Sequence, residues 1–492
     1  MHFPWWYVPG FTAPMLIAIV AVLHVIVAHY AVGGGFFLAR EITFAHRTKD
    51  QEYLAYLHRH AAFFILITVV FGAITGVGIW WTIGLASPLA TALLIQVFVF
   101  GWATEWVFFV IELSSAFLLY YAWRRIPAWL RESLAWIYAI AAWISLVLIT
   151  GITSFMLHSG SWPETRNFWH GFFNPQFWPQ VIARTGAAFL LSALYVFLHA
   201  SITLPMGRLR EVVQKRASLP SLLGIVCIGV GGFLWFLLLP ESSAAVILAA
   251  PVITVFVLAV AGLTILVFAM VFIASVGTPA WLNPGFAGLL LLLGLAAFGL
   301  GEFVREAVRK PFVVDRVVFG NQIFKEEVPK LREEGYLQRG IWTRYYVERK
   351  YPQLIEDGKI IYSRLKDLSP SDRLALGETL FLYHCNDCHA KSLGYSAVAP
   401  LLRGMSQQKI KEFLLNLNEP YFYMPPWCGR EEEAEILAEY LSTLAPPWPG
   451  NLPRIAPSGF EASASEATAA TSGTLKGLSR HGMTKRSSES FQ

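Results

Sequence analysis

Eight long apolar stretches dominate this sequence and constrain what it can fold into. A helix needs about 20 apolar residues to cross the hydrocarbon core of a bilayer, and each stretch is long enough. They lie near residues 12–39, 61–84, 90–122, 134–157, 181–204, 219–240, 244–275 and 284–306. Only 14% of the 492 residues are charged, against roughly a quarter in an average soluble domain. The sequence therefore predicts an all-α fold, a polytopic membrane helical bundle of about eight transmembrane helices.

Lysine and arginine are concentrated in alternate connections between these spans. The connections on one side hold Arg40, Arg47, Lys49, Arg59, Arg124, Arg125, Arg131, Arg208, Arg210, Lys215 and Arg216. Those on the other side hold almost none beyond Arg166. The positive-inside rule places the basic connections in the cytoplasm, so the N-terminus and the part after the eighth span are expected outside. The first apolar run has no basic flank or cleavage site of a signal peptide, so we expect a retained helix.

Residues 384–389 read His-Cys-Asn-Asp-Cys-His and predict a covalent haem. Cys385 and Cys388 have the spacing for two thioether bonds to haem c, and His389 follows directly as the proximal iron ligand. A bare C-x-x-C can also be a zinc half-site or a redox pair, but zinc needs two further ligands at a matching spacing. The only later cysteine is Cys428, which stands alone. Haem c is attached outside the cytoplasm, in agreement with the topology above.

The stretch around this motif, residues 368–447, resembles a small class I cytochrome c. It has an apolar-periodic helix ending at His384, a Tyr-Met-Pro-Pro-Trp segment at 423–427 and a second helical pattern at 431–444. The resemblance implies that Met424 is the distal iron ligand and that the carbonyl of Pro400 orients the ring of His389. Two alternatives are that Met424 only fills the core, or that Met405 is the ligand. Thioether ligation favours a high-potential electron-transfer haem.

Several ionisable residues lie inside the predicted spans, where each needs a partner or a function. His24 and His29 are five residues apart in the first span, about 140° around a helix, so they cannot share one ligand. Glu105 and Glu112 in the third span are seven apart and share one face, so this pair could relay protons.

The eighth span ends with the charged segment GEFVREAVRKPF, residues 301–312. Glu302 and Glu306 are four residues apart, as are Arg305 and Arg309. One interpretation of this segment is a salt-bridge ladder at the membrane surface.

Residues 12–312 resemble subunit I of the cytochrome bd oxidases. Four features carry the resemblance: His24 followed by three glycines at 33–35, the FGAITGVGIWW span, the two-glutamate span, and the E-x-x-R-x-P-aromatic signature at 306–312. The resemblance implies that His24 and Glu306 are axial ligands of two membrane haems of b or d type. It implies that Arg309 pairs with haem propionates or with Glu306. Glu105 and Glu112 would lie on a proton route to the oxygen-reducing haem.

The chain departs from that family in four places. Arg184 and Ala259 stand where the family has the histidine and methionine ligands of its low-spin haem. Only residues 240–243 connect the sixth and seventh predicted spans, where a long quinol-binding loop is expected. The ninth span is missing, and the cytochrome-like stretch follows instead. These departures favour electron entry through haem c rather than directly from quinol.

The sequence thus predicts a bd-like respiratory haem subunit that reduces O2 to water with electrons delivered through haem c. The alternative is a non-oxidase membrane electron-transfer subunit that links a periplasmic redox enzyme to the respiratory chain. We expect four regions: the membrane haem domain (1–309), a connector (310–367), a cytochrome c domain (368–447) and a disordered tail (448–492). Expected partners are membrane lipid, a second membrane subunit resembling bd subunit II, and a periplasmic donor such as a cytochrome c. No nucleic-acid partner is expected, and the location is the bacterial cytoplasmic (inner) membrane.

Overall fold

The computed structural model describes residues 6–276, 279–394, 396–419 and 421–445. Eight of its helices, or helix pairs, are long and apolar enough to cross a membrane, which confirms the predicted all-α membrane bundle. These spans are α1 (Ala13–Arg47), α2 with α3 (Gln51–Ile65 and Gly72–Ala86), α5 (Val99–Tyr121), α6 (Ala128–Ser154), α9 (Phe177–Thr203), α10 (Arg208–Leu237), α12 (Pro251–Val276) and α13 (Pro284–Ala307). The chain is an integral membrane protein. The expected tail at 448–492 lies outside the described residues.

Two spans differ from the predicted boundaries because the chain breaks where the apolar pattern continues. The stretch 90–122 is two helices, α4 (Pro88–Val97) and α5, and Phe98 between them has a non-helical backbone. Phe98 is fully buried and packs edge-on against Phe155 at 5.0 Å, which accounts for an apolar residue at a break. The seventh span begins at Pro251 rather than 244, because a separate short helix, α11 (Glu241–Ala249), precedes it. The predicted connection of only four residues, 240–243, was therefore wrong. Residues 238–250 connect α10 to α12.

Glycines allow the central helices to pack at backbone contact. A Cβ at Gly33 of α1 would lie 1.9 Å from the carbonyl oxygen of Ala188 in α9. A Cβ at Gly186 of α9 would lie 2.3 Å from the carbonyl oxygen of Gly224 in α10. Small residues at such contacts are typical of membrane helix packing, where van der Waals contact replaces the hydrophobic effect. Helix α9 is thereby held between α1 and α10, and its polar side chains are buried in the bundle.

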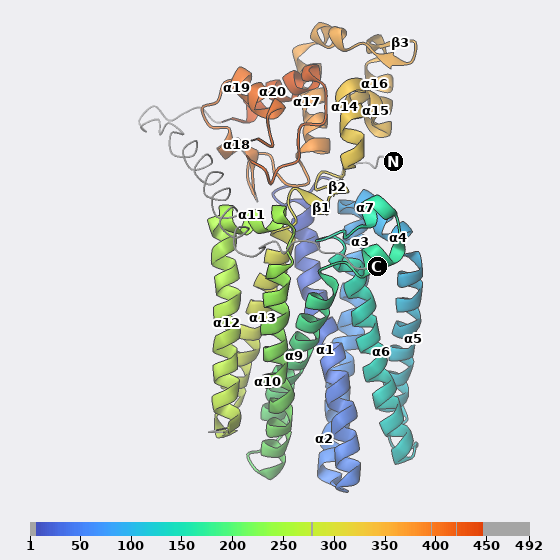
Figure 1. The fold of residues 1–492 in the computed structure, drawn as a ribbon, viewed down its shortest axis with the longest axis vertical. Coiled ribbons are helices and arrows are strands. Elements are labelled where there is room, and N and C mark those ends of the chain that lie inside the picture. The colour runs from blue at the N-terminus through green and yellow to red at the C-terminus, as the bar shows by residue number, and fades with distance from the viewer. Residues whose placement is uncertain (1–5, 277–278, 395, 420, 446–492) are drawn as a thin grey trace, which may run out of the picture.

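An outer domain sits on one end of the bundle, as Figure 1 shows, and the N-terminal segment reaches the same end. The helices of the outer domain are α14 (Val328–Glu334), α15 (Tyr336–Arg339), α16 (Ile341–Lys350), α17 (Pro370–His384), α18 (Val398–Leu401), α19 (Gln407–Leu415) and α20 (Glu431–Leu444). Two small antiparallel hairpins pair β1 (Phe312–Val314) with β2 (Val318–Phe319), and β3 (Ile355–Glu356) with β4 (Lys359–Ile360). Helices α7 (Trp162–Thr165) and α8 (Phe168–Phe172) lie in the connection before α9.

The predicted connector takes part in two hydrophobic cores. Val314 and Val318 pack with Phe155 on the outer end of the membrane bundle. From Phe319 onward, connector side chains such as Leu337 share one core with Leu380 and other residues of the cytochrome-like stretch. The connector therefore packs on the outer end of the membrane bundle and also contributes to the core of the outer domain.

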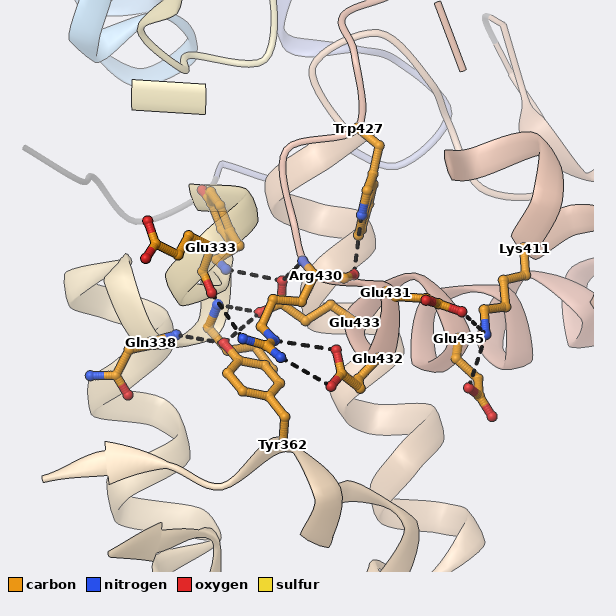
Figure 2. Close-up of polar contacts among 12 residues, drawn as sticks. Glu333, Gln338, Tyr362, Lys411, Trp427, Arg430, Glu431, Glu432, Glu433 and Glu435 are labelled. Atoms are coloured by element: carbon orange, nitrogen blue, oxygen red, sulfur yellow. Dashed lines mark hydrogen bonds and ion pairs between the residues drawn. The ribbon is translucent and has the colours of Figure 1, made fainter. Parts of the chain in front are cut away.

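A buried carboxylate joins the connector to the last helix (Figure 2). Glu433 of α20 is fully buried and accepts hydrogen bonds from the backbone N–H groups of Tyr336 at 3.0 Å and Leu337 at 2.7 Å. It also accepts from the N–H of Arg430 at 2.8 Å and the hydroxyl of Tyr362 at 3.0 Å. Four donors satisfy the carboxylate and fix α15 against the start of α20.

The basic residues gather at the opposite end of the bundle from the outer domain. Arg40 and Arg216 both pair there with Glu41, a fully buried carboxylate in α1. The hydroxyl of Tyr53 also donates to Glu41, at 2.7 Å. We refer to this end as the basic end and to the other as the outer end.

Candidate functional site

The two cysteines of the haem-attachment motif lie in a tight turn at the C-terminus of α17. The side chain of Ser369 caps the first turn of this helix by accepting from the N–H of Asp372 at 3.2 Å. At the other end, the N–H groups of Cys388 and His389 both donate to the carbonyl of Cys385, at 3.0 and 2.8 Å. The turn brings both thiols and the following imidazole into one loop. Burial raises the pKa of the Cys385 thiol to about 12.

One ring nitrogen of His389 is fixed by a hydrogen bond. Its Nδ1 lies 2.8 Å from the backbone carbonyl of Ser396, which accepts a hydrogen bond when Nδ1 is protonated. The predicted partner, the Pro400 carbonyl, was wrong, because the loop turns back at Ser396, which has a positive φ of 51°. Burial lowers the pKa of His389, which favours the neutral ring. A neutral ring with Nδ1 hydrogen-bonded presents Nε2 to a metal, so His389 fits its predicted role.

Both candidate distal ligands belong to the same domain. Met424 is half-buried in the loop before α20, where its N–H donates to the carbonyl of Tyr421 at 2.8 Å. Met405 packs against the edge of the outer-domain core. The choice of Met424 over Met405 stays a prediction.

The attachment motif contacts two segments at the outer end of the bundle, the one that precedes α1 and the one that follows α13. The ammonium of Lys310, just after α13, donates to the sulfur of Cys388 at 3.4 Å. The side chain of Asn386 donates to the carbonyl of Trp6, just before α1, at 3.1 Å. Gly394 packs so closely on Gly10 that a Cβ there would lie 2.0 Å from the Gly10 carbonyl oxygen. The motif therefore lies directly over the outer ends of α1 and α13.

The charged segment at the end of α13 forms two ion pairs at i,i+3 spacing. Arg305 Nε lies 2.8 Å from a carboxylate oxygen of Glu302, and Arg309 pairs with Glu306. Arg309 also donates from Nη1 to the carbonyl of Val313 at 3.1 Å, while its buried Nε has no partner among the described residues. Burial lowers the pKa of Arg309 to about 9. The ion pairs of the predicted salt-bridge ladder are thus present in the structure. The carboxylate oxygen of Glu306 that does not pair with Arg309 remains able to bind a metal.

Both histidines of α1 have Nδ1 engaged by a hydrogen bond. Nδ1 of His24 lies 3.2 Å from the hydroxyl of Thr75, and Gly76 lets the ring lie flat on α3, where a Cβ would be 3.1 Å from Cε1. Nδ1 of His29 bonds the carbonyl of Val25 at 2.7 Å. Nε2 of His29 is buried without a hydrogen-bond partner among the described residues. By donor chemistry each histidine fits a haem iron, and the family resemblance selects His24.

The two glutamates of α5 both face α6. Ser145 of α6 donates to Glu105 at 2.8 Å and is also within hydrogen-bonding reach of Glu112. Their predicted shared face is confirmed, whereas their predicted role in proton transfer is untested by the fold. Arg184 of α9 is buried and lies within electrostatic reach of Glu302 on α13. The assignment of Arg184 to the position of the family's low-spin haem ligand stays a prediction.

One polar cluster in the bundle was not predicted. His60 of α2 and His199 of α9 are buried and meet nitrogen to nitrogen, with Nδ1 atoms 3.1 Å apart. In the sequence, His199 lies inside a predicted span, while His60 lies directly before one, after His58 and Arg59. Their separation of 139 positions hides the contact from any local pattern.

Comparisons with known proteins address the membrane domain. Residues 13–234 match the family model for cytochrome bd terminal oxidase subunit I. A search of curated proteins found no match. Among solved structures, one chain of the bd oxidase from Geobacillus thermodenitrificans superposes with a TM-score of 0.55 at 17% identity, over 62% of this chain and 89% of that one. The membrane part of this chain is therefore similar to cytochrome bd oxidase subunit I and shares the fold of the bd oxidase structure.

Proposed function

We propose that this chain is the haem-bearing subunit of a bd-like terminal oxidase that receives its electrons through a covalent haem c. The overall reaction combines one O2 with four electrons and four protons to give two water molecules. Two findings support the oxidase class: the match of residues 13–234 to bd subunit I, and the shared fold. The histidines support the haems, because Nδ1 of His24, His29 and His389 is hydrogen-bonded, an arrangement that directs Nε2 toward a metal.

The contact between Lys310 and Cys388 carries the proposed electron route. Lys310, which contacts Cys388, is one residue from Arg309, the ion-pair partner of Glu306. The contact of Asn386 with Trp6 joins the motif to the segment that leads into α1 and His24. These contacts support the proposal that Cys385 and Cys388 would hold haem c close to the helices that carry both candidate ligands of the membrane haems.

The residues of this chain have separable roles in that scheme. A bound haem supplies reversible one-electron chemistry, and a membrane haem with an open iron position supplies oxygen binding. Cys385 and Cys388 would anchor haem c, and His389 with Met424 would complete its iron coordination. His24 and Glu306 would hold the two membrane haems, and Arg309 would offset the charge of Glu306 or of a propionate. Glu105 and Glu112 would supply protons from α5.

The same scheme predicts the surroundings of the protein. We place the outer domain and the N-terminus on the periplasmic side of a bacterial inner membrane, because the basic connections lie at the other end. A periplasmic cytochrome c is a suitable donor. Large exposed apolar side chains on α5 and α12, such as Trp106 and Leu258, fit contact with lipid or a second membrane subunit.

Oxygen uptake by the full chain with its membrane partner tests this function. With reduced soluble cytochrome c as donor, we expect steady uptake in the wild type. The double variant Cys385→Ser with Cys388→Ser should lose almost all of it, because haem c cannot attach, while the membrane haems remain.

Two outcomes would redirect the proposal. Rapid turnover of the double variant with a quinol analogue would return the chain to the quinol oxidases. Haems that bind neither O2 nor CO when reduced would favour the non-oxidase electron-transfer subunit.

A further inference from the structure

The histidine pair near the basic end is part of a buried network of hydrogen-bonding rings. His60 uses both ring nitrogens: Nδ1 faces Nδ1 of His199 at 3.1 Å, and Nε2 faces the hydroxyl of Tyr30 at 3.3 Å. The hydroxyl of Tyr56 lies 3.3 Å from Nδ1 of His199. These four side chains come from α1, α2 and α9. His60, Tyr30 and Tyr56 are completely buried, and His199 is 8% exposed.

Aromatic rings pack around this network. Phe63 stacks on His199 at 4.8 Å, and Phe37 meets His60 edge-on at 5.3 Å. Tyr195 stacks on Tyr30 at 4.2 Å. The charged group Arg59 acts electrostatically on His199 and Tyr56. Burying two imidazoles and two phenols in a membrane bundle is costly, and such groups usually serve the movement of ions or protons.

The network runs from the basic end into the bundle. His199 lies four residues before the end of α9, about 6 Å along the helix. Tyr30 lies deeper, only six residues or about 9 Å along α1 from His24. Beyond Tyr30, the next titratable group toward α5 is Tyr138 of α6, which lies within electrostatic reach of both Tyr30 and Glu112.

We propose that His199, His60 and Tyr30 form a proton relay that takes protons from the basic end of the bundle toward Glu112. The proposal rests on the proposed function, because reduction of O2 consumes protons that must reach the interior. His60 is the central member, since an imidazole can accept a proton at one nitrogen while it releases one from the other.

Each transfer conserves one proton. An Nε2–H bond forms at His199 with a proton from the basic end as its Nδ1–H bond breaks and the Nδ1–H bond of His60 forms. The Nε2–H bond of His60 breaks as a new O–H bond forms at Tyr30. The original O–H bond of Tyr30 breaks as its proton passes to Tyr138, which passes its own hydroxyl proton to the carboxylate of Glu112, so His199, His60, Tyr30 and Tyr138 all stay neutral. Return of His60 to its first tautomer readies the relay for the next proton.

Proton uptake during haem reduction tests the relay without relying on turnover with O2. The full chain with its membrane partner is placed in vesicles with the basic end facing a trapped pH dye. The membrane haems are then reduced anaerobically by a one-electron chemical donor. Tyr30→Phe removes one oxygen and keeps the ring on Tyr195, and His60→Phe keeps an aromatic ring of similar shape. His58→Phe is the matched control, since His58 is a histidine of the same helix that stacks on Trp123 outside the network.

We expect Tyr30→Phe and His60→Phe to slow proton uptake on the order of 100-fold, a typical effect of losing an acid–base group. Haem content and the rate of electron transfer from haem c should stay at the wild-type level, as should all properties of His58→Phe. Uptake within twofold of wild type in both network variants would overturn the relay. Loss of membrane haem in Tyr30→Phe would overturn it too, by showing a structural role. A wild type that takes up protons but consumes no O2 would support the relay and contradict only the oxidase.

Discussion

The outer and basic ends of the membrane bundle use histidine in opposite ways. In the outer half of α1, Nδ1 of His24 bonds the hydroxyl of Thr75 and Nδ1 of His29 bonds the carbonyl of Val25. Nε2 of His29 has no hydrogen-bond partner among the described residues. Near the basic end, His60 and His199 face each other, and His60 has partners on both nitrogens. A free nitrogen suits a metal ligand, whereas a nitrogen with a titratable partner suits proton transfer.

This contrast indicates that electrons and protons would enter the membrane bundle at opposite ends. Electrons would enter at the outer end, where the attachment motif, Lys310 and the segment before α1 converge. Protons would enter at the basic end, where the only outward member of the network is His199. The two flows would meet inside the bundle between His24 and Glu112. Variants at the two ends should therefore fail in different ways.

The largest expected difference is in haem content. His24→Ala and Glu306→Ala should each remove one membrane haem completely and leave haem c, whereas His60→Phe should remove none. A pyridine haemochrome assay on the purified chain counts the haems. If Glu306 belongs only to a salt-bridge ladder, Glu306→Ala will weaken folding and leave the number of haems unchanged. If His29→Ala removes a haem and His24→Ala does not, the buried free nitrogen of His29 is the ligand.

The next largest effect concerns the iron of haem c. Met424→Ala should keep covalent haem on a denaturing gel but abolish the absorption band of a thioether–iron bond. Met405→Ala is the control, because its side chain lies in the same domain at the edge of the core. If Met405→Ala abolishes the band instead, the distal ligand is Met405, and the electron route over α13 is unchanged.

A smaller effect is expected at the ion pair of α13. Arg309→Gln removes the partner of Glu306 and the donor to the Val313 carbonyl. Breaking a buried pair by removing one member costs about 3–5 kcal/mol, and the partial exposure of Glu306 favours the low end. Thermal unfolding followed by membrane-haem absorbance measures the loss. Arg305→Gln is the comparison, and a greater loss there than in Arg309→Gln would contradict this assignment.

The smallest predicted effect is a pH dependence confined to the outer domain. His384 packs between Tyr336 and Trp427, and burial lowers its pKa to about 3. The unfolded histidine, with a pKa near 6.5, binds a proton that the folded one does not, so stability should fall as pH falls below about 6.5 toward 3. The slope contributed by one site is at most about 1.4 kcal/mol per pH unit. Urea unfolding followed at the haem c Soret band should show this slope, and His384→Phe should remove it.

The membrane architecture was predictable because local sequence determines it. Span-length apolar runs gave all eight membrane crossings, and the attachment motif and the helix at 431–444 follow from spacing and periodicity. The break at Phe98 and the short helix before Pro251 were not predictable, because both lie inside continuous apolar sequence. Only tertiary packing, such as the contact of Phe98 with Phe155, distinguishes a break from a continuous span there.

The missed parts of the candidate site are contacts between distant segments. Lys310 meets Cys388 across 78 positions, and Asn386 meets Trp6 across 380. His60 and His199 belong to different spans and show no shared pattern in the sequence. The correct partner of His389, Ser396, depended on a loop conformation with positive φ that no motif specifies. Long-range pairing therefore had to come from the fold.

The order in which the haems are reduced tests the central claim most directly. In an anaerobic stopped-flow experiment, reduced soluble cytochrome c is mixed with the oxidised chain and each haem is followed at its own wavelength. We predict that haem c is reduced first and the membrane haems afterwards, and that Cys385→Ser with Cys388→Ser leaves the membrane haems oxidised. Reduction of the membrane haems at the wild-type rate in that double variant would contradict entry through haem c.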